Sequence, residues 1–144
     1  MITASIREED FFESWSDEDA EIRARYCFPV TSLNGSDSTM VACMDVPPGN
    51  RQGRHSNSAE ETHLILQGTA EIGTDQEKAT ATAGDVVVIP ARVPHDVKNV
   101  GDETLRVVFF MPSSTLVTVF DETLAPAGQK VFVSGQPDTS EASS

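Results

Sequence analysis

The side chains best suited to chemistry in this chain are two histidines and one glutamate, His55, Glu61 and His95. Two imidazoles and a carboxylate can fill one face of an iron-type metal site, which leaves the other coordination positions open for a substrate or for oxygen. All three residues lie in stretches that read as short β-strands and turns. The sequence therefore predicts a metal-assisted reaction at a site assembled from strands that are distant along the chain.

Two spaced motifs surround these residues. Residues 49–68 read Gly-x5-His-x-Asn-x3-Glu-x6-Gly, and residues 84–99 read Gly-x5-Pro-x-Arg-x2-His-x3-Asn. Gly68 permits a tight turn that reverses the chain after the glutamate. Pro90 closes the valine-rich strand before it, because proline cannot donate a hydrogen bond to a sheet. Both motifs therefore predict strands that end close to the candidate ligands.

The first motif places two pairs of residues on common faces. Alternate residues of a strand share a face, so Asn57 is expected to point the same way as His55. By the same rule, His63 shares a face with Glu61. The strand that carries His95 must fold back to meet them, which predicts a barrel mouth lined by imidazole and carboxylate groups.

Composition limits the class of partner. The chain has 144 residues, with 23 acidic and 10 basic side chains and a formal net charge of −13. One domain is expected at this length, and the negative charge argues against nucleic acid and anionic membranes, because both bind positive patches. No apolar run approaches the roughly 20 residues that span a bilayer, and residues 1–21 are acidic, unlike a signal peptide. We therefore expect a cytoplasmic protein whose partner is a small-molecule substrate.

Strand signals dominate the chain after an acidic N-terminal arm. We expect the arm over residues 1–24, a β-barrel domain over residues 25–133 and a disordered tail over residues 134–144, which are rich in serine and acid. About eight to ten short strands, broken by glycine, proline and aspartate, predict an all-β sandwich or barrel. The arm, whether a short helix or extended, is expected to dock its aromatic residues on the body or on a second subunit.

Two of the expected strands are apolar at consecutive positions, residues 64–66 and residues 107–110. A strand with one face in water should alternate between apolar and polar residues. The outer faces of these strands are therefore expected to pack on a partner, and a homodimer is the simplest candidate.

The two cysteines, Cys27 and Cys43, lie symmetrically about Gly35 in the sequence. A hairpin that turns there would place them opposite each other on neighbouring strands. In a reducing cytosol we expect them to be two buried thiols, with no CxxC motif to suggest redox chemistry or zinc binding.

The two motifs resemble those of the cupin family. The resemblance covers about residues 40–112, and it implies a double-stranded β-helix, the jelly-roll barrel of cupins. It also implies that His55, Glu61 and His95 ligate a divalent metal, with Fe(II) favoured and Mn, Ni or Zn as alternatives. We further expect Glu61 to take a direct part in catalysis.

Two positions depart from the family pattern. Asn57 stands where the first motif usually has a second histidine, and Arg92 stands where the second motif usually has a glycine. Asparagine is a weaker ligand than imidazole for such metals, so Asn57 is expected either as a fourth ligand or as an outer-shell group that orients the others. His63 is an alternative donor, although a place in the pocket wall is the favoured interpretation. Arg92 either binds an anionic substrate group or is solvated.

The resemblance implies a small-molecule enzyme but does not fix one reaction, because one fold hosts many. Ring-opening or C–C-cleaving dioxygenation, an oxidoreductase activity, is the first expectation. Isomerisation or cyclisation through a metal enolate is the second, and a non-catalytic cupin that binds a small molecule is the third. A mostly hydrophobic pocket is expected in each case. Its predicted residues are Met44, Ile65, Val97, Phe109 or Phe110, His63 and Arg92.

Overall fold

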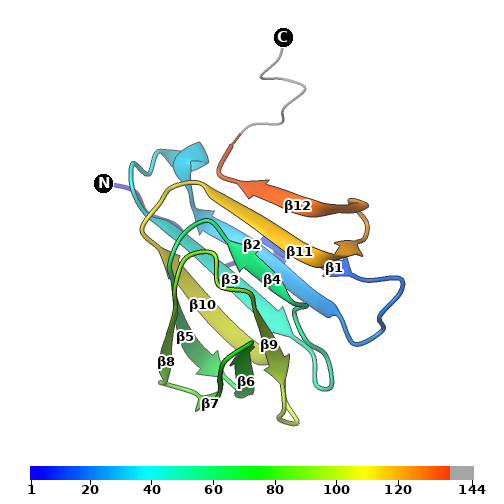
Figure 1. Cartoon of the computed structure of the whole chain (residues 1–144). Helices are drawn as coiled ribbons and strands as arrows, with labels where there is room; N and C mark the ends of the chain where they lie inside the picture. The colour runs from blue at the N-terminus through cyan, green and yellow to red at the C-terminus, as the bar shows by residue number, and fades with distance from the viewer. Residues whose placement is uncertain (137–144) are drawn as a thin grey trace.

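The computed structural model describes residues 1–136, which fold into two facing sheets (Figure 1). Twelve strands make two antiparallel sheets of six strands each, which confirms the predicted all-β jelly-roll architecture. The tail expected over residues 134–144 lies mostly outside the described residues, and Ser134 itself ends the last strand.

Each sheet combines strands from distant parts of the chain. The first sheet has the order β1 (Phe12–Trp15), β2 (Arg23–Val30), β3 (Met40–Val46), β10 (Leu105–Met111), β5 (Glu61–Gln67) and β8 (Val86–Ile89). The second has the order β12 (Gln129–Ser134), β11 (Leu116–Leu124), β4 (His55–Asn57), β9 (His95–Asn99), β6 (Thr69–Thr74) and β7 (Lys78–Thr82). The first motif is therefore divided between the sheets, because β4 and β5 lie on opposite sides of the barrel.

Helical structure is limited to two single turns of 3-10 helix, Glu8–Asp10 and Ser32–Asn34, within the described residues. Thr31 caps the second turn, where its side chain accepts a hydrogen bond from the amide of Leu33. Over the same part of the chain, no helix has the length and apolar character needed to cross a membrane. The fold thus depends on its strands alone.

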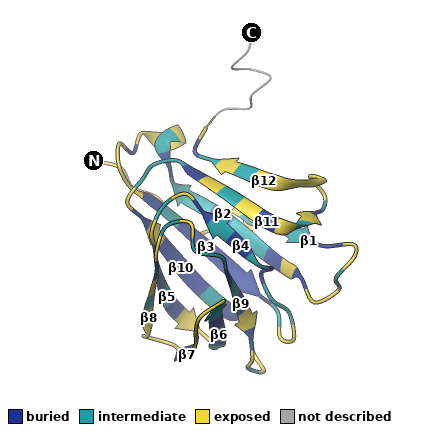
Figure 2. Cartoon of the chain, viewed as in Figure 1, coloured by how far each residue is buried: buried dark blue, intermediate teal, exposed yellow. Residues whose placement is uncertain are grey.

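One end of the space between the sheets is a packed apolar core. In β5 the inward positions Glu61, His63 and Ile65 are buried, as the alternation of a strand requires. Ile65 joins Met44 and Val97 in the largest apolar cluster, and none of these three has any exposed surface. Burial of each such side chain contributes about 1.5–3 kcal/mol to folding. Figure 2 shows the buried residues gathered on the inner strands.

Gly68 makes the turn between β5 and β6 that the first motif predicts. Its φ is 87°, a conformation that favours glycine, and a Cβ built there would lie 3.0 Å from the Cα of Leu105. Any side chain at this position would push β10 away from β5. The turn therefore fixes the strand that presents Glu61.

The N-terminal arm adds a strand to the first sheet. After its helical turn, β1 pairs with β2 over its whole length. Phe11 packs on the outer face of the sheet in a small cluster with Val108, and the guanidinium of Arg25 lies 4.4 Å from the centre of its ring. The arm's aromatic residues thus dock on the body of their own chain.

Cys27 and Cys43 face each other across the first sheet. They are register partners on β2 and β3, and both are free, buried thiols. The hairpin between them contains Gly35, whose φ of 98° ends the second helical turn. The expected opposition of two buried thiols is confirmed.

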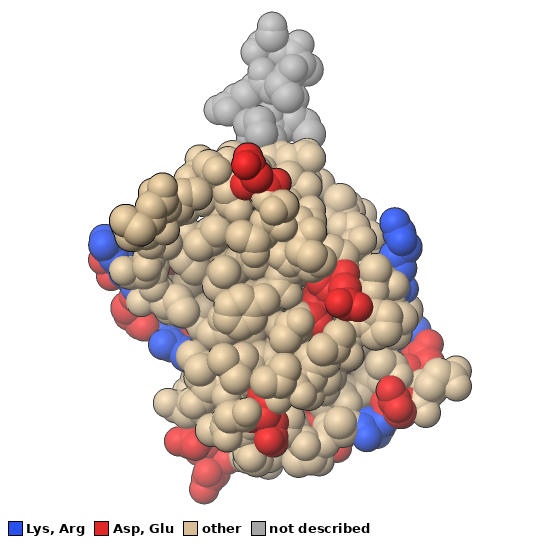
Figure 3. All heavy atoms as spheres, turned by 90° about the vertical axis from the view of Figure 1, so that its left-hand side faces the viewer, with Lys and Arg blue, Asp and Glu red and all other residues tan. Residues whose placement is uncertain are grey.

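The outer face of the first sheet carries apolar side chains on β8, β5 and β10. Two rows of register partners cross these strands: Val88, Thr62 and Phe110 form one row, and Val86, Leu64 and Val108 form the next. Val86 and Val88 on the edge strand are 58% and 52% exposed. Figure 3 shows the side of the molecule where β8 lies; most of this surface is uncharged, the basic side chains lie at its margins, and a few acidic groups lie within it. Apolar residues therefore occupy both faces of β5 and β10, as the sequence predicts.

Candidate metal centre and adjoining cavity

His55 and His95 lie side by side in the second sheet. They are register partners on β4 and β9, and their ring centroids are 4.3 Å apart. Both are buried, with 1% and 2% of their surface exposed. The predicted meeting of the two motifs at these histidines is confirmed.

Glu61 reaches the histidine pair from the opposite sheet. It is the first residue of β5, points inward and is 4% exposed. Its Oε2 lies 3.4 Å from Nε2 of His95. One ligand atom from each of His55, Glu61 and His95 lies within 4.8 Å of the others. The predicted ligand set is therefore assembled, and it spans both sheets.

Backbone carbonyls set the orientation of both imidazoles. Nδ1 of His55 lies 2.7 Å from the carbonyl oxygen of Gly53, and Nδ1 of His95 lies 2.9 Å from that of Val93. A carbonyl oxygen can only accept, so each Nδ1 carries the proton and each Nε2 keeps a free lone pair. Nε2 of His95 is buried and has no hydrogen-bond partner. An orphaned acceptor of this kind, held by a carbonyl on its other nitrogen, fits a metal ligand.

The charge state of the cluster also suits a cation. Burial, and then the neighbouring His95, lower the pKa of His55 to about 4, so this imidazole is neutral at pH 7. Burial works to raise the pKa of Glu61, but His63 and His95 outweigh it and hold that pKa well below its usual range. Burial likewise works to lower the pKa of His95, and the Glu61 carboxylate reverses this and raises it. The cluster thus presents a neutral imidazole beside an ionised carboxylate.

His63 is the direct partner of Glu61. Its Nε2 lies 2.5 Å from Oε2 of Glu61, and its ring meets that of Phe109 edge-on at 4.5 Å between centroids. The side chain has no exposed surface. His63 is therefore placed behind the pocket wall, where it donates a hydrogen bond that orients the Glu61 carboxylate. The shared face with Glu61 is as predicted, whereas exposure to the pocket is not observed.

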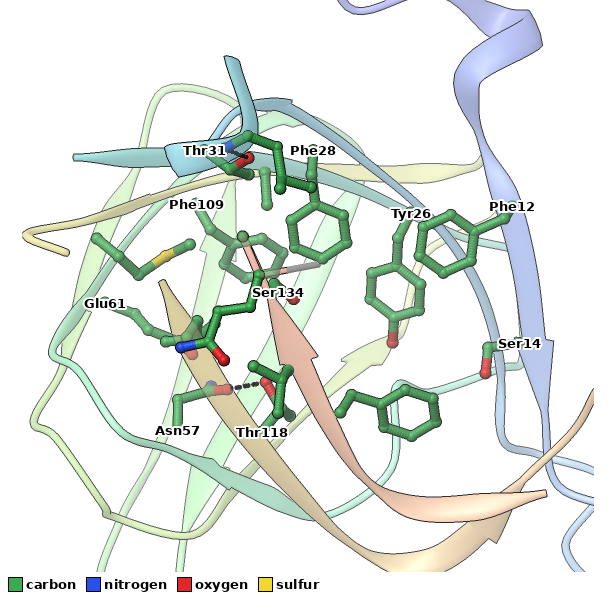
Figure 4. A pocket seen from close by; sticks show the side chains of 18 of the residues that line it. Phe12, Ser14, Tyr26, Phe28, Thr31, Asn57, Glu61, Phe109, Thr118 and Ser134 are labelled. Atoms are coloured by element: carbon green, nitrogen blue, oxygen red, sulfur yellow. Dashed lines mark hydrogen bonds between the residues drawn. The ribbon is translucent and has the colours of Figure 1, made fainter. Parts of the chain in front are cut away.

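A cavity of about 510 Å³ adjoins the cluster, and Glu61 and Asn57 form its inner end (Figure 4). A volume of this order suits a drug-sized molecule. Its walls come from both sheets and are mainly apolar, with six aromatic side chains among the lining residues. The aromatic lining residues are Phe12, Tyr26, Phe28, Phe109, Phe120 and Phe132. Glu61 is thus shared between the candidate metal centre and the cavity.

Residues 42–111 match the family model described as Cupin domain. The chain contains a cupin domain. Two curated relatives match at 33% identity. One is an uncharacterized protein of Methanocaldococcus jannaschii, matched over 64 residues, which are 44% of this chain and 51% of the relative. The other is the polyketide synthase CurC of Streptomyces cyaneus, matched over 84 residues, which are 58% of this chain and 53% of the relative. The chain spans about half the length of the curated relatives it matches.

Solved structures show the same fold. The oxalate decarboxylase of Lactobacillus farciminis, in its formate complex, has a TM-score of 0.64 at 22% identity, over 68% of this chain and 31% of that chain. The polyketide cyclase RemF from Streptomyces resistomycificus has a TM-score of 0.60 at 17% identity, over 77% of this chain and 80% of that chain. At these identities the likeness shows the cupin fold alone.

Asn57, the first departure from the cupin motif, lines the cavity beside His55. Its Oδ1 accepts a hydrogen bond from the Thr118 hydroxyl at 2.6 Å, as the dashed line in Figure 4 marks. The carbonyl oxygen is the only side-chain atom of asparagine that suits these metals, and here it is directed at Thr118. The arrangement favours a wall position for Asn57 over the role of a fourth ligand.

Arg92, the second departure, lies exposed on the loop before β9 and is not among the residues that line the cavity. Its φ of 65° explains why the family pattern has glycine here, since a left-handed conformation costs an ordinary residue about 1–2 kcal/mol. Its backbone amide donates to the carbonyl oxygen of Asn57 at 2.8 Å. Arg92 therefore joins the loop to β4 through its backbone, and its exposed side chain agrees with the second of the two alternatives, a solvated arginine.

Three predicted pocket residues lie in the core of the cupin. Met44, Ile65 and Val97 point inward as their strand parity predicts, but they are fully buried and form none of the cavity surface. Of the two candidate phenylalanines, Phe109 lines the cavity and Phe110 is 41% exposed on the outside. The alternation of residues along a strand predicts which face a side chain occupies, but it does not predict how far along the barrel the side chain lies. For this reason the sequence predicts Met44, Ile65 and Val97 in the pocket, although they lie in the core.

Asp96 has a supporting role that the sequence does not reveal. Its Oδ1 accepts from the amide of Gly53 at 2.8 Å, and its Oδ2 binds Nη1 of Arg51 at 2.6 Å. Gly53 is the residue whose carbonyl oxygen holds His55. Asp96 therefore fixes the loop that orients the first histidine, although its place next to His95 suggests only a surface residue.

Proposed function

We propose that this cupin is a metal-dependent enzyme that acts on a small organic molecule in the aromatic cavity, and that the reaction is cyclisation or isomerisation of an enolisable substrate. One observation carries the proposal: Glu61 belongs both to the cluster of metal-ligand atoms and to the cavity lining. A substrate oxygen at the inner end of the cavity would therefore lie beside the cation. Similarity to the polyketide synthase CurC and to the fold of the polyketide cyclase RemF supports this class of reaction.

His55, Glu61 and His95 would hold the cation, and their donor atoms fit Fe(II) first, with Mn, Ni or Zn as alternatives. A divalent cation in this position would supply Lewis acidity, which polarises a carbonyl oxygen. The depressed pKa of Glu61 makes its carboxylate a weak base. We therefore assign Glu61 to holding the cation, rather than to accepting a substrate proton.

The remaining residues orient the Glu61 carboxylate and surround the substrate. His63 donates from Nε2 to Glu61 and so fixes the plane of the carboxylate. Phe109 covers His63 and separates this hydrogen bond from the cavity. The aromatic walls exclude water from the substrate, which protects a reactive enol or enolate from side reactions.

Dioxygenation is the second candidate. The observation in its favour is the ligand set itself, because two imidazoles and one carboxylate with open positions are typical of non-haem iron oxygenases. Oxygen dependence separates the two candidates. Cyclisation or isomerisation proceeds without O₂ and conserves mass or releases water, whereas dioxygenation consumes O₂ and adds two oxygen atoms to the products.

The first experiment is metal analysis of protein purified without chelator. We expect one divalent metal per chain in the wild type, less than about a tenth of that in His95→Ala, and no change in Lys98→Ala, an exposed control on the same strand. Turnover of aromatic β-diketones is then followed by mass spectrometry with and without O₂. Protein that holds no metal, or that turns over no substrate under either condition, would contradict the proposal.

We also propose that two copies pair through the outer face of β8, β5 and β10, over the two apolar rows and away from Arg106 on the same face of β10. A chain with a net charge of −13 repels its own copies, so an interface needs a face without charge. The rows that contain Val86, Val88 and Phe110 meet this condition. Sedimentation should give a dimer for the wild type and a monomer for Val88→Lys. Val131→Lys, at an exposed apolar position of the second sheet outside the cavity lining, should remain dimeric, and a monomeric wild type would refute the pairing.

A further inference from the structure

We infer that Asn57 is a hydrogen-bond donor to the substrate rather than a ligand of the cation, and that Thr118 is the residue that positions its amide. Nδ2 of Asn57 would donate to the substrate oxygen at the inner end of the cavity. This inference rests on the proposed function, because it names the side chain that recognises that oxygen. It depends on the place of Asn57, on the partner of its Oδ1, and on the strands that hold both residues.

Asn57 lies beside both the candidate metal centre and the cavity. It follows His55 by two residues on β4, so the two side chains share a face of the strand. The residue is 6% exposed, and it lines the inner end of the cavity together with Glu61 (Figure 4). A substrate oxygen that approaches Glu61 therefore also approaches the Asn57 amide.

One end of the Asn57 amide is already occupied. The Thr118 hydroxyl donates to Oδ1 at 2.6 Å. The other end, Nδ2, carries two protons and can only donate. Nδ2 has no hydrogen-bond partner within residues 1–136, and it is not one of the fully buried polar atoms. Thr118 thus fixes Oδ1 toward β11 and leaves Nδ2 for a ligand in the cavity.

The contact between Asn57 and Thr118 follows from the pairing of β4 with β11, in which the two residues are register partners. The backbone of Asn57 is held as well, because its carbonyl oxygen accepts from the amide of Arg92. β11 lies outside the residues that match the cupin model. A strand beyond the motif therefore supplies the hydroxyl that orients the residue at the motif's usual second histidine.

An amide donor suits the class of reaction proposed for this site. Imidazole at this position could bind a cation through a lone pair, whereas the amino group of asparagine has no lone pair to offer and can only donate. Enolisation develops negative charge on a substrate oxygen, and a donor held beside that oxygen stabilises the charge. The exchange of histidine for Asn57 thus replaces a ligand with a donor.

Asn57→Leu separates a donor from a ligand, because leucine has a similar shape and no polar atom. Competition with a chromophoric chelator should give the same Zn(II) affinity for this variant as for the wild type. A fall of more than about 10-fold would place Asn57 among the ligands and overturn the inference.

Binding of two neutral probes to the whole chain, metal-free and zinc-loaded, tests the donor itself. 1-Tetralone has a carbonyl acceptor, and tetralin has the same ring system without it. Equilibrium dialysis gives the ratio of their affinities. In Asn57→Leu the preference for 1-tetralone should fall about 5-fold, as expected for one hydrogen bond between neutral groups. A preference equal to that of the wild type would refute the assignment of Nδ2.

The same ratio tests Thr118. Thr118→Val keeps the shape but removes the hydroxyl, so the preference for 1-tetralone should fall about 3-fold as the amide loses its orientation. Thr118→Ser should restore the preference, and Thr80→Val, an exposed control on β7, should leave it unchanged. A wild-type preference in Thr118→Val would exclude the positioning role.

The charge on the substrate oxygen is tested with benzoylacetone, whose enolate is followed by its ultraviolet absorption in zinc-loaded protein. The ionisation constant of the bound probe should fall about 10-fold in Asn57→Leu, because a hydrogen bond to a charged oxygen is stronger than one to a neutral oxygen. A purely structural role of Asn57 would leave this constant unchanged, and such a result would contradict the inference.

The probes also separate this inference from the proposed function. If the protein holds no metal but its preference for 1-tetralone depends on Asn57, the proposed function is wrong and the inference stands. If metal-dependent turnover occurs and the preference does not depend on Asn57, the proposed function stands and the inference is wrong.

Discussion

The two ends of the cavity are built in different ways. The inner end is polar and rigid: His55 and His95 are fixed by backbone carbonyls, and Glu61 is fixed by a third imidazole. The rest of the cavity is largely aromatic, and most of its rings come from β1, β2, β11 and β12, although Phe120 of β11 also lies 4.9 Å from the His55 ring, measured between centroids. The family match at residues 42–111 contains the whole inner cluster and excludes these four strands.

This difference separates the part of the cavity that the family model covers from the part that lies outside it. The chemistry available at the cluster follows from the family motifs. If the cavity binds the substrate as we propose, the choice of ligand should depend on segments before and after the matched region, which carry Phe12, Tyr26 and Phe28 on one side and Phe120 and Phe132 on the other. Substitutions at the two ends should therefore have different consequences, and the following predictions test that division.

The largest effect is expected from Glu61→Gln. The amide keeps the shape of the side chain but removes the negative charge shared by the cluster, so metal affinity should fall by more than about 100-fold, beyond the range for outer-shell groups. Competition with a chromophoric chelator measures this. Retention of metal at wild-type affinity would show that the cluster is not the metal site. The proposed division of the cavity into a metal-binding end and an aromatic end would then be wrong.

A large loss of stability is expected from Ile65→Ala in the packed core. The side chain is fully buried, and its truncation should lower the free energy of unfolding by about 2–5 kcal/mol. Phe132→Ala at the cavity should lower it by less, because that ring is only partly buried and borders open space. Urea unfolding of both variants measures the two free energies of unfolding. Similar decreases in the two variants would mean that the outer wall is as tightly packed as the core.

His63→Phe should weaken metal binding by about 10- to 100-fold without removing any ligand atom from the cluster. The phenyl ring retains the contact with Phe109 but cannot donate to Glu61, so the carboxylate loses its orientation. The chelator competition used for Glu61→Gln gives the affinity. A loss as complete as that of Glu61→Gln would instead make His63 a ligand.

The smallest effect concerns Asp45, which binds Arg25 and Arg106 on the outer face of the first sheet, away from both ends of the cavity. Burial works to raise its pKa, but Arg106 and Arg25 outweigh this and lower it. A carboxyl with a lowered folded pKa contributes stability above its unfolded value of 3.8, and that stability is lost as pH falls through the folded pKa. Because both arginines are about one-third exposed, Asp45→Asn should reduce this acid sensitivity by only about 1 kcal/mol. Thermal unfolding of both proteins between pH 2 and pH 5 would reveal it, and parallel curves would exclude a role for Asp45.

The sequence predicts the inner end well because the spacing of two motifs determines it. Proline and glycine end the strands at set distances from His55 and His95, and parity places Glu61 and His63 on one face. The structure confirms each of these placements. The role of His63 as a donor depends on a side-chain hydrogen bond, which spacing does not encode.

The outer end is hard to predict for a physical reason. Phe12 and Phe132 lie near opposite ends of the described chain, and only the pairing of β1 and of β12 with their neighbours brings them to one cavity. No local pattern distinguishes an inward residue at the cavity from one in the core, so Ile65 and Val97 resemble pocket residues in sequence.

Glu61 belongs to one sheet, whereas His55 and His95 belong to the other. A cation at this point would cross-link the two sheets, because it would bind residues of both. Binding to the folded chain alone raises the free energy of unfolding by about 2.7 kcal/mol at a free concentration 100 times the dissociation constant. Chelation would then do more than halt turnover, because it would also remove a link between the two sheets at the inner end of the cavity. Supply of the ion would therefore govern the stability of the protein as well as its chemistry.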